Sequence, residues 1–224
     1  MRILQIGKYY PPVRGGIEAH VQVLSSSLVK KKEISHLTVV ASNITPRLAN
    51  TQIGKLRIIL LPRVMFLSVP FNFSLGRYLK QPCDIIHIHL PNPTAVLAYF
   101  FAKPSTPVVV TWHADFDGFI IRKLLLRPFL HYLFRKSKVI FVTNPVMLSS
   151  LRQFESKIKV VPLGIALPLK PDTKTLLYEK LRGRENFVLF IGRLVRYKGI
   201  EYLIRSMRHV NSVLFIIGDG PLRR

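Results

Sequence analysis

The feature that most constrains the fold of this chain is the alternation of short Val/Ile-rich runs with segments of helical period. Several runs are continuously apolar, which is typical of strands covered on both faces of a parallel sheet. The strands that this pattern predicts are residues 2–7, 37–41, 57–61, 84–89, 107–112, 138–143, 158–161, 187–192 and 213–218. Strand–helix alternation of this kind predicts an α/β protein with a parallel sheet.

The segments between the runs carry the helical signal. Ile17, Val21, Leu24 and Leu28 are spaced by four, three and four residues, which places them on one helical face. Two later helices are predicted, one after Asp172 as a capping residue and one over residues 200–208.

A break in the pattern divides the chain. Pro162, Pro168 and Pro171 lie close together and argue against a regular element there. The strand–helix pattern starts again at Phe187. We therefore predict a complete α/β domain over residues 1–165 and the opening of a second over 166–224. The second part offers too few strands to bury both faces of a parallel sheet, so we expect it to be incomplete in this chain or completed by something else.

The net charge of the chain limits the classes of molecule that it is expected to bind. It has 34 Lys+Arg against 11 Asp+Glu, a formal net charge of +23, and both halves are basic. Such a field attracts nucleic acid, anionic lipid or phosphorylated substrates. The basic residues are spread out rather than grouped with aromatic residues, so nucleic acid is the least favoured of these partners. A generally basic protein without a polyanionic partner is the alternative interpretation.

Composition excludes other classes. A hydrophobic content of 49% excludes disorder. A single cysteine, Cys83, excludes a disulfide framework and a Cys-based zinc site, and its place beside an apolar strand predicts a buried structural thiol.

One segment of the sequence has a composition that can contact a membrane surface. Residues 119–138 interleave apolar and basic side chains around Pro128. The segment can lie on an anionic membrane surface, or it can be a packed helix with a solvated basic face. No export signal and no apolar stretch of spanning length is visible, so we expect a cytoplasmic protein, with peripheral contact at the inner membrane face as an option.

The first candidate site is the turn after the first strand, which contains Gly15 and Gly16 before a helix that begins near Ile17. A helix N-terminus at the carboxyl edge of a parallel sheet favours the binding of phosphate. Paired glycines, which have no side chain, let the phosphate approach the backbone closely. The alternative is a tight turn with no ligand. Glu18 lies near the helix start, where the positive end of the helix dipole stabilises a carboxylate.

The second candidate site follows the fourth and fifth predicted strands. His87 and His89 share one face of a strand, but neither a carboxylate nor a third histidine stands at ligand-like spacing. Packing or hydrogen bonding is therefore favoured over a metal pair, and we predict no metal. His113 follows a buried strand at the edge where ligands dock, with Asp115 close behind, so it can serve as a hydrogen-bond donor or as an acid or base. A structural histidine is the alternative.

The third candidate site is the loop 192–199, between a strand and the next helix. Its Arg193 and Lys198 can both reach a diphosphate held at the start of that helix. A solvated basic loop is the alternative interpretation.

Taken in order, several motifs resemble those of glycosyltransferase family 4, which has the GT-B fold. They are Gly15-Gly16-Ile17-Glu18, Asp84-Ile-Ile-His-Ile-His89, Thr111-Trp-His-Ala-Asp115, Val160-Val-Pro-Leu-Gly-Ile165, Gly192-Arg193 with Lys198-Gly199, and Gly218-Asp-Gly-Pro221. Each motif is weak alone, and the ordered set is specific. The Thr-Trp-His-Ala-Asp version is most similar to mannosyltransferase-type members that build lipopolysaccharide or exopolysaccharide.

The resemblance implies two Rossmann-like domains: an acceptor-side domain over residues 1–165, and over 166–224 the nucleotide-sugar-binding domain, incomplete here. It implies transfer of a sugar, with retained anomeric configuration and no cofactor or metal, from a GDP- or UDP-linked donor to a glycan or lipid-linked acceptor. By analogy, Gly15 and Gly16 approach the donor, His113 hydrogen-bonds near the reacting sugar, and Arg193 and Lys198 neutralise the leaving diphosphate. Glu18, His89 and Asp115 are candidates for secondary or acceptor contacts.

One motif of the family is not seen. Its members carry a glutamate pair, E-x7-E, after the Gly-Asp-Gly-Pro region, and this sequence ends at Arg224. We therefore expect a truncated family member. The alternative function is an inactive module that docks on a membrane or on a partner protein.

Overall fold

The computed structural model of the protein describes residues 1–66, 69–114, 120–164 and 186–223. The chain forms two compact units, Met1–Ala166 and Leu167–Arg224, and each is described by itself.

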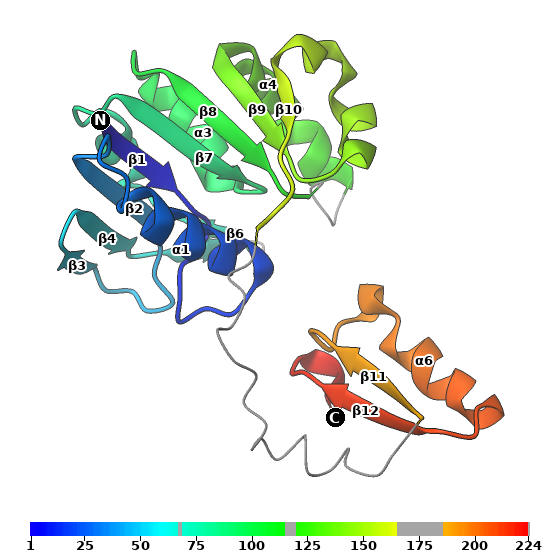
Figure 1. The fold of residues 1–224 in the computed structure, drawn as a ribbon. Helices are drawn as coiled ribbons and strands as arrows, with labels where there is room; N and C mark the ends of the chain where they lie inside the picture. The colour runs from blue at the N-terminus through cyan, green and yellow to red at the C-terminus, as the bar shows by residue number, and fades with distance from the viewer. Residues whose placement is uncertain (67–68, 115–119, 165–185, 224) are drawn as a thin grey trace. The chain divides into compact units, whose positions relative to one another are not determined.

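The first unit is built on an eight-stranded sheet with the strand order β10-β9-β8-β7-β1-β2-β4-β3 (Figure 1). Neighbouring strands are parallel except β3, which runs antiparallel to β4 at one edge. The strands are β1 (Arg2–Ile6), β2 (His36–Ser42), β3 (Ala49–Ile53), β4 (Leu56–Leu61), β7 (Ile85–Leu90), β8 (Val108–Trp112), β9 (Ser137–Val142) and β10 (Ile158–Val160).

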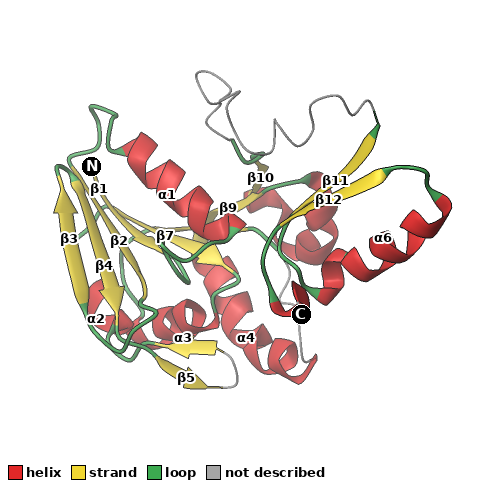
Figure 2. Ribbon diagram, turned by 90° about the horizontal axis from the view of Figure 1, so that it is seen from below, coloured by secondary structure: helices red, strands yellow, loops and turns green. Residues whose placement is uncertain are grey.

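Helices cover both faces of this sheet. Helix α1 (Gly16–Leu28) lies on one face, and the other face carries α2 (Leu75–Leu79), α3 (Pro93–Ala102) and α4 (Ile120–Lys136) (Figure 2). A run of 3₁₀ turns, Pro145–Lys157, precedes β10, and β5 (Val64–Phe66) and β6 (Val69–Phe71) form a small hairpin. The two faces have separate hydrophobic cores.

The three central strands are apolar on one face and partly polar on the other. Leu4 and Ile6 of β1, and the matching residues of β7 and β8, belong to the core beneath α3 and α4. The side chains between them point to the face that carries α1, because successive residues of a strand alternate between faces. Four of these are polar and buried: Gln5, His87, His89 and Thr111. We call these four residues the polar patch.

The polar patch lies at the point where the chain changes direction across the sheet. Strand β1 is flanked by β2 on one side and by β7, much later in the chain, on the other. In open α/β sheets the carboxyl edge at such a switch point is where ligands bind. His89 is one residue from the end of β7, and its neighbour β8 ends at Trp112.

The described part of the second unit, residues 186–223, contains two parallel strands, β11 (Phe187–Ile191) and β12 (Val213–Ile217). Helix α6 (Ile200–Ser206) connects them, with 3₁₀ turns at Arg196–Lys198, Met207–His209 and Pro221–Arg223. The loops that follow the two strands are joined by backbone hydrogen bonds, Gly192 N to Ile217 O at 3.0 Å and Leu194 N to Asp219 O at 2.9 Å.

All nine predicted strands are present, with ends shifted by a residue or so. Three strands were not predicted: the polar edge strand β3 and the short hairpin strands β5 and β6. The predicted helix over 200–208 ends earlier, at Ser206, and continues as a 3₁₀ turn. The predicted helix after Asp172 lies outside the described residues.

Two further expectations have structural outcomes. Cys83 is half-buried against the core rather than fully buried, so the predicted buried thiol is wrong in degree. Burial still raises the pKa of this thiol. Among the described residues, no helix is both long enough and apolar enough to cross a membrane.

The close packing of the two loops in the second unit gives a prediction. A Cβ added at Gly218 would overlap the carbonyl oxygen of Gly192, which is rigid backbone. Gly218→Ala is therefore expected to separate the loops and to speed amide hydrogen exchange in β11 and β12 at least about tenfold, equivalent to a loss of roughly 1.4 kcal/mol in local opening free energy. Gly76→Ala is the control, because a Cβ there meets nothing within 4 Å. Equal exchange in both variants would contradict the packing argument.

Candidate functional site

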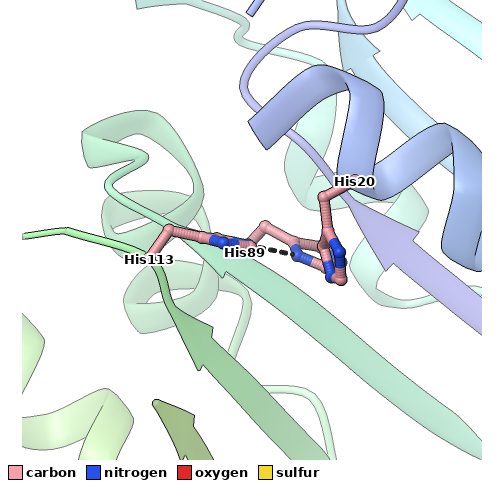
Figure 3. Close-up of side chains that lie close together, drawn as sticks. All are labelled: His20, His89 and His113. Carbon is pink, nitrogen blue, oxygen red and sulfur yellow. Dashed lines mark hydrogen bonds between the residues drawn. The ribbon is translucent and has the colours of Figure 1, made fainter. Parts of the chain in front are cut away.

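The candidate site is a group of histidines from three separate elements (Figure 3). His89 comes from β7, His113 follows β8, and His20 lies in α1. His89 is fully buried in the polar patch, while His20 and His113 are half-buried. The fold thus brings together residues that are far apart in the sequence.

A chain of hydrogen bonds orders two of these rings. His89 Nδ1 lies 3.0 Å from His113 Nε2, and His89 Nε2 lies 2.9 Å from Nε2 of Gln5. The two rings are stacked, with centroids 5.3 Å apart. With the Gln5 amide donating, His89 accepts at Nε2 and donates from Nδ1, so His113 accepts at Nε2 and carries its own hydrogen on Nδ1.

That arrangement leaves one polar ring atom of His113 for another partner. Its Nδ1 is buried and has no hydrogen-bond partner among the described residues. Because an unpaired buried donor is costly, the atom suits a hydrogen bond to a ligand oxygen. His113 was predicted at this edge of the sheet for this role.

Burial keeps the cluster uncharged. It lowers the pKa of His113 to about 4 and that of His87 to about 3, and neighbouring histidines add to both shifts. Burial also lowers the pKa of His89 well below its ordinary value and lowers that of His20. The rings therefore act at neutral pH as hydrogen-bonding or ligating groups rather than as cations.

His87 packs against the ring of His89 within the polar patch. Its Nε2 lies 2.7 Å from Thr111 Oγ1 on the neighbouring strand, and its ring centroid lies 4.2 Å from that of His89. The prediction that His87 and His89 share a face and serve hydrogen bonding is confirmed by these contacts.

His20 was missed by sequence reasoning. Its ring meets those of His89 and His113 edge-on, with centroid distances of 5.7 and 5.0 Å. The sequence has no third histidine at ligand-like spacing from His87 and His89, but the fold brings His20 to them, because spacing along the chain does not show what a helix places above a strand. A signal was available: His20 precedes Val21, a residue of the predicted buried face of the helix.

The three rings are also close enough to share an ion. His20, His89 and His113 each offer one ring nitrogen, and these nitrogens lie within 4.8 Å of one another. Neutral imidazole is a common ligand of Zn²⁺ and similar ions.

The diglycine turn lies before α1 in the same unit. Gly15 is the N-cap in an extended conformation, without a side-chain hydrogen bond, and Glu18 lies in the first turn. A Cβ at Gly15 would overlap the Glu18 carboxylate, whereas one at Gly16 would meet nothing. The carboxylate thus lies against the helix start, where the dipole favours it. The phosphate role of Gly15 and Gly16 stays a prediction.

The remaining predicted site residues belong to the second unit or lie outside the described residues. Arg193 and Lys198 are exposed in the second unit, in the loop between β11 and α6, and Lys198 Nζ lies 5.6 Å from the Tyr197 ring centroid. Asp115 lies outside the described residues. The structure brings His113 together with His89, while the second unit is described by itself.

The chain is similar to known glycosyltransferases. The sequence model of the family described as Glycosyltransferase Family 4 matches residues 14–167 of this chain. O-antigen chain mannosyltransferase C of Escherichia coli is 26% identical over 236 residues, which cover 99% of this chain and 62% of that protein. D-rhamnosyltransferase WbpZ of Pseudomonas aeruginosa is 29% identical over 157 residues, covering 67% of this chain and 41% of that protein. The chain thus spans less than two thirds of the length of either relative.

Among solved structures, Alr3699/HepE of Anabaena in complex with UDP-glucose matches with a TM-score of 0.65 and 16% identity. The match covers 98% of this chain and 61% of that chain. At this identity the likeness shows the fold alone, and it confirms the predicted α/β, GT-B-like class.

The buried histidines predict how stability depends on pH in the metal-free protein. Unfolding returns His113 to an ordinary pKa near 6.5, so between about pH 6.5 and 4 the unfolded state binds more protons and stability falls as the pH is lowered. His113→Gln removes this contribution. Its unfolding free energy in urea is expected to fall less between pH 7 and 5 than that of the unchanged protein, by about 2 kcal/mol. Equal losses in the two proteins would contradict the buried, neutral His113.

Proposed function

Because the chain belongs to glycosyltransferase family 4, we propose that it takes part in transferring a sugar from a nucleotide-sugar donor to an acceptor hydroxyl. The observation that carries the proposal is the hydrogen-bonded His89–His113 pair at the carboxyl edge of the sheet. No finding favours the alternative of an inactive docking module over a transferase.

In the proposed reaction the bond between the anomeric carbon and the diphosphate oxygen breaks, and the acceptor oxygen bonds to that carbon. The acceptor proton leaves with the nucleoside diphosphate. His113, held neutral and fixed by His89, donates a hydrogen bond to an oxygen of the reacting sugar. A donor already oriented for the transition state does not have to reorganise during the reaction. By family resemblance the configuration of the anomeric carbon is retained.

Negative charge builds on the leaving diphosphate as the glycosidic bond breaks. We assign its stabilisation to Arg193 and Lys198, whose basic side chains are exposed in one short loop. Charge-assisted hydrogen bonds to phosphate oxygens are about twice as strong as neutral ones. Fixed cations therefore lower the barrier most when the charge is largest.

The substrate class follows from the relatives. The two named relatives are an O-antigen chain mannosyltransferase and a D-rhamnosyltransferase, and HepE was solved with UDP-glucose. We propose a GDP- or UDP-linked hexose as donor and a growing cell-surface polysaccharide, glycan or lipid-linked, as acceptor.

Peripheral membrane contact fits an acceptor of this kind. On α3 and α4, Phe101, Leu124 and Leu125 are 72%, 65% and 67% exposed. Phe129, one turn after Leu125, lies 6.5 Å from Phe101 between ring centroids. The net charge of +23 complements anionic lipid. We propose that this apolar face, made of Phe101, Leu124 and Leu125, inserts into the headgroup region of the membrane.

Donor binding tests the phosphate role. Arg193→Ala with Lys198→Ala is expected to weaken the binding of GDP or UDP at least about tenfold in calorimetric titration, because two charge-assisted contacts are lost. Arg205→Ala with Arg208→Ala is the control, since it removes two exposed cations of the same unit outside that loop. Equal weakening in both pairs would reduce the effect to net charge, and unchanged binding would refute the assignment.

Transfer tests the role of His113. With GDP-mannose and UDP-glucose as donors, release of nucleoside diphosphate is measured in the presence of an acceptor glycan. His113→Ala is expected to lower kcat about a hundredfold, which corresponds to roughly 2.7 kcal/mol. Nucleotide affinity is expected to stay unchanged, since no phosphate contact is removed. Full activity of the variant would contradict the assignment.

Vesicle flotation tests the membrane contact. Phe101→Glu with Leu125→Glu is expected to abolish flotation with vesicles rich in anionic lipid, because it places charge within the apolar face. Leu48→Glu with Ile53→Glu is the control, since these residues are 58% and 62% exposed outside the apolar face. Flotation that persists in the first pair would contradict insertion there.

A further inference from the structure

The histidine cluster contains one more ring than the proposed sugar contact uses. That contact uses His113 and the neighbour that orients it, His89. His20 adds a third ring from another element, and it approaches the same ring nitrogens (Figure 3). Its place above the pair is fixed by α1, whose Val21 is packed in the core on this face.

The distances suit a transition-metal ion. An ion of the Zn²⁺ class bonds imidazole nitrogen at about 2.0–2.1 Å, which places two such ligands about 3.3 Å apart in a tetrahedral site. His89 Nδ1 and His113 Nε2 are already 3.0 Å apart, and all three nitrogens lie within 4.8 Å. Small rotations of the half-buried His20 and His113 rings bring the set into range.

The surroundings favour ligation as well. A metal-bound histidine usually donates its second ring N–H to a nearby oxygen, which fixes the ring.

Gln5 can supply that oxygen. It lies against His89 Nε2 through its amide nitrogen, while its buried Oε1 has no partner among the described residues. Exchanging the two ends of the Gln5 amide would let Oε1 accept the hydrogen of His89 Nε2. That exchange frees the Nδ1 lone pair of His89 for an ion and pairs the Gln5 oxygen.

We propose that His20, His89 and His113 form a binding site for a divalent transition-metal ion of the Zn²⁺ class, with Gln5 orienting His89. Three protein ligands leave a fourth position for water, as in open zinc sites. The site goes beyond the proposed transfer reaction, which uses no metal. An ion bound at His113 Nε2 would take the place of the hydrogen bond from His89 Nδ1.

The test uses Co²⁺ as a spectroscopic probe of the full chain, purified without a histidine tag. Tetrahedral Co²⁺ gives visible absorption bands, and Zn²⁺ added afterwards is expected to remove them by displacement. His20→Ala is the decisive variant, because His20 has no part in the His89–His113 hydrogen bond. It is expected to weaken Co²⁺ binding at least about tenfold. His113→Ala is expected to weaken it similarly.

His131→Ala is the matched control, because this histidine lies on α4 outside the cluster, and it is expected to bind Co²⁺ as the unchanged protein does. Circular dichroism establishes that each variant is folded. Absence of tetrahedral bands in the unchanged protein, or their persistence at full strength in His20→Ala, would overturn the proposal and leave only a hydrogen-bonded pair. Because the readout is metal binding, it is independent of whether sugar transfer is observed.

Discussion

The hydrogen bond between His89 Nδ1 and His113 Nε2 is the interaction on which the proposed chemistry depends. A histidine at a strand end can serve many purposes; this contact restricts His113 to one orientation, and burial keeps its ring neutral. The contact exists because polar residues replace apolar ones on a single face of β1, β7 and β8. Apolar residues on the opposite face of the same strands bury the core beneath α3 and α4, which keeps the sheet stable despite the polar patch.

The same arrangement explains why the candidate site lies at the β1–β7 boundary. Parallel neighbours bring their carboxyl ends to one edge, so residues that follow different strands meet there although dozens of residues separate them in sequence. Helix α1 then adds His20 from above. Three imidazoles shielded from water do not readily become charged, and this favours uses that need a neutral ring: a hydrogen bond to a sugar oxygen, or a bond to a metal ion.

Sequence reasoning predicted what periodicity encodes. The apolar runs predicted all nine expected strands, because strands buried on both faces of a parallel sheet have nearly continuous apolar sequences rich in Val and Ile. The edge strand β3 was missed because its residues, such as Asn50 and Gln52, are polar and pair only with β4. His113 was predicted since it directly follows a strand, whereas His20 and Gln5 were not, because their proximity to it arises only from tertiary packing. The family, predicted from ordered motifs, is confirmed by the match over residues 14–167.

The most direct test of this account is a measurement of scalar coupling across the N–H···N hydrogen bond between His89 and His113 by nitrogen NMR. In the metal-free protein at pH 7, we expect a resolved coupling between His89 Nδ1 and His113 Nε2, with both rings neutral. Loss of this coupling in His89→Gln, with the remaining spectrum unchanged, would support the assignment. The absence of any coupling, together with a His113 ring that takes up a proton near its ordinary pKa, would contradict the account.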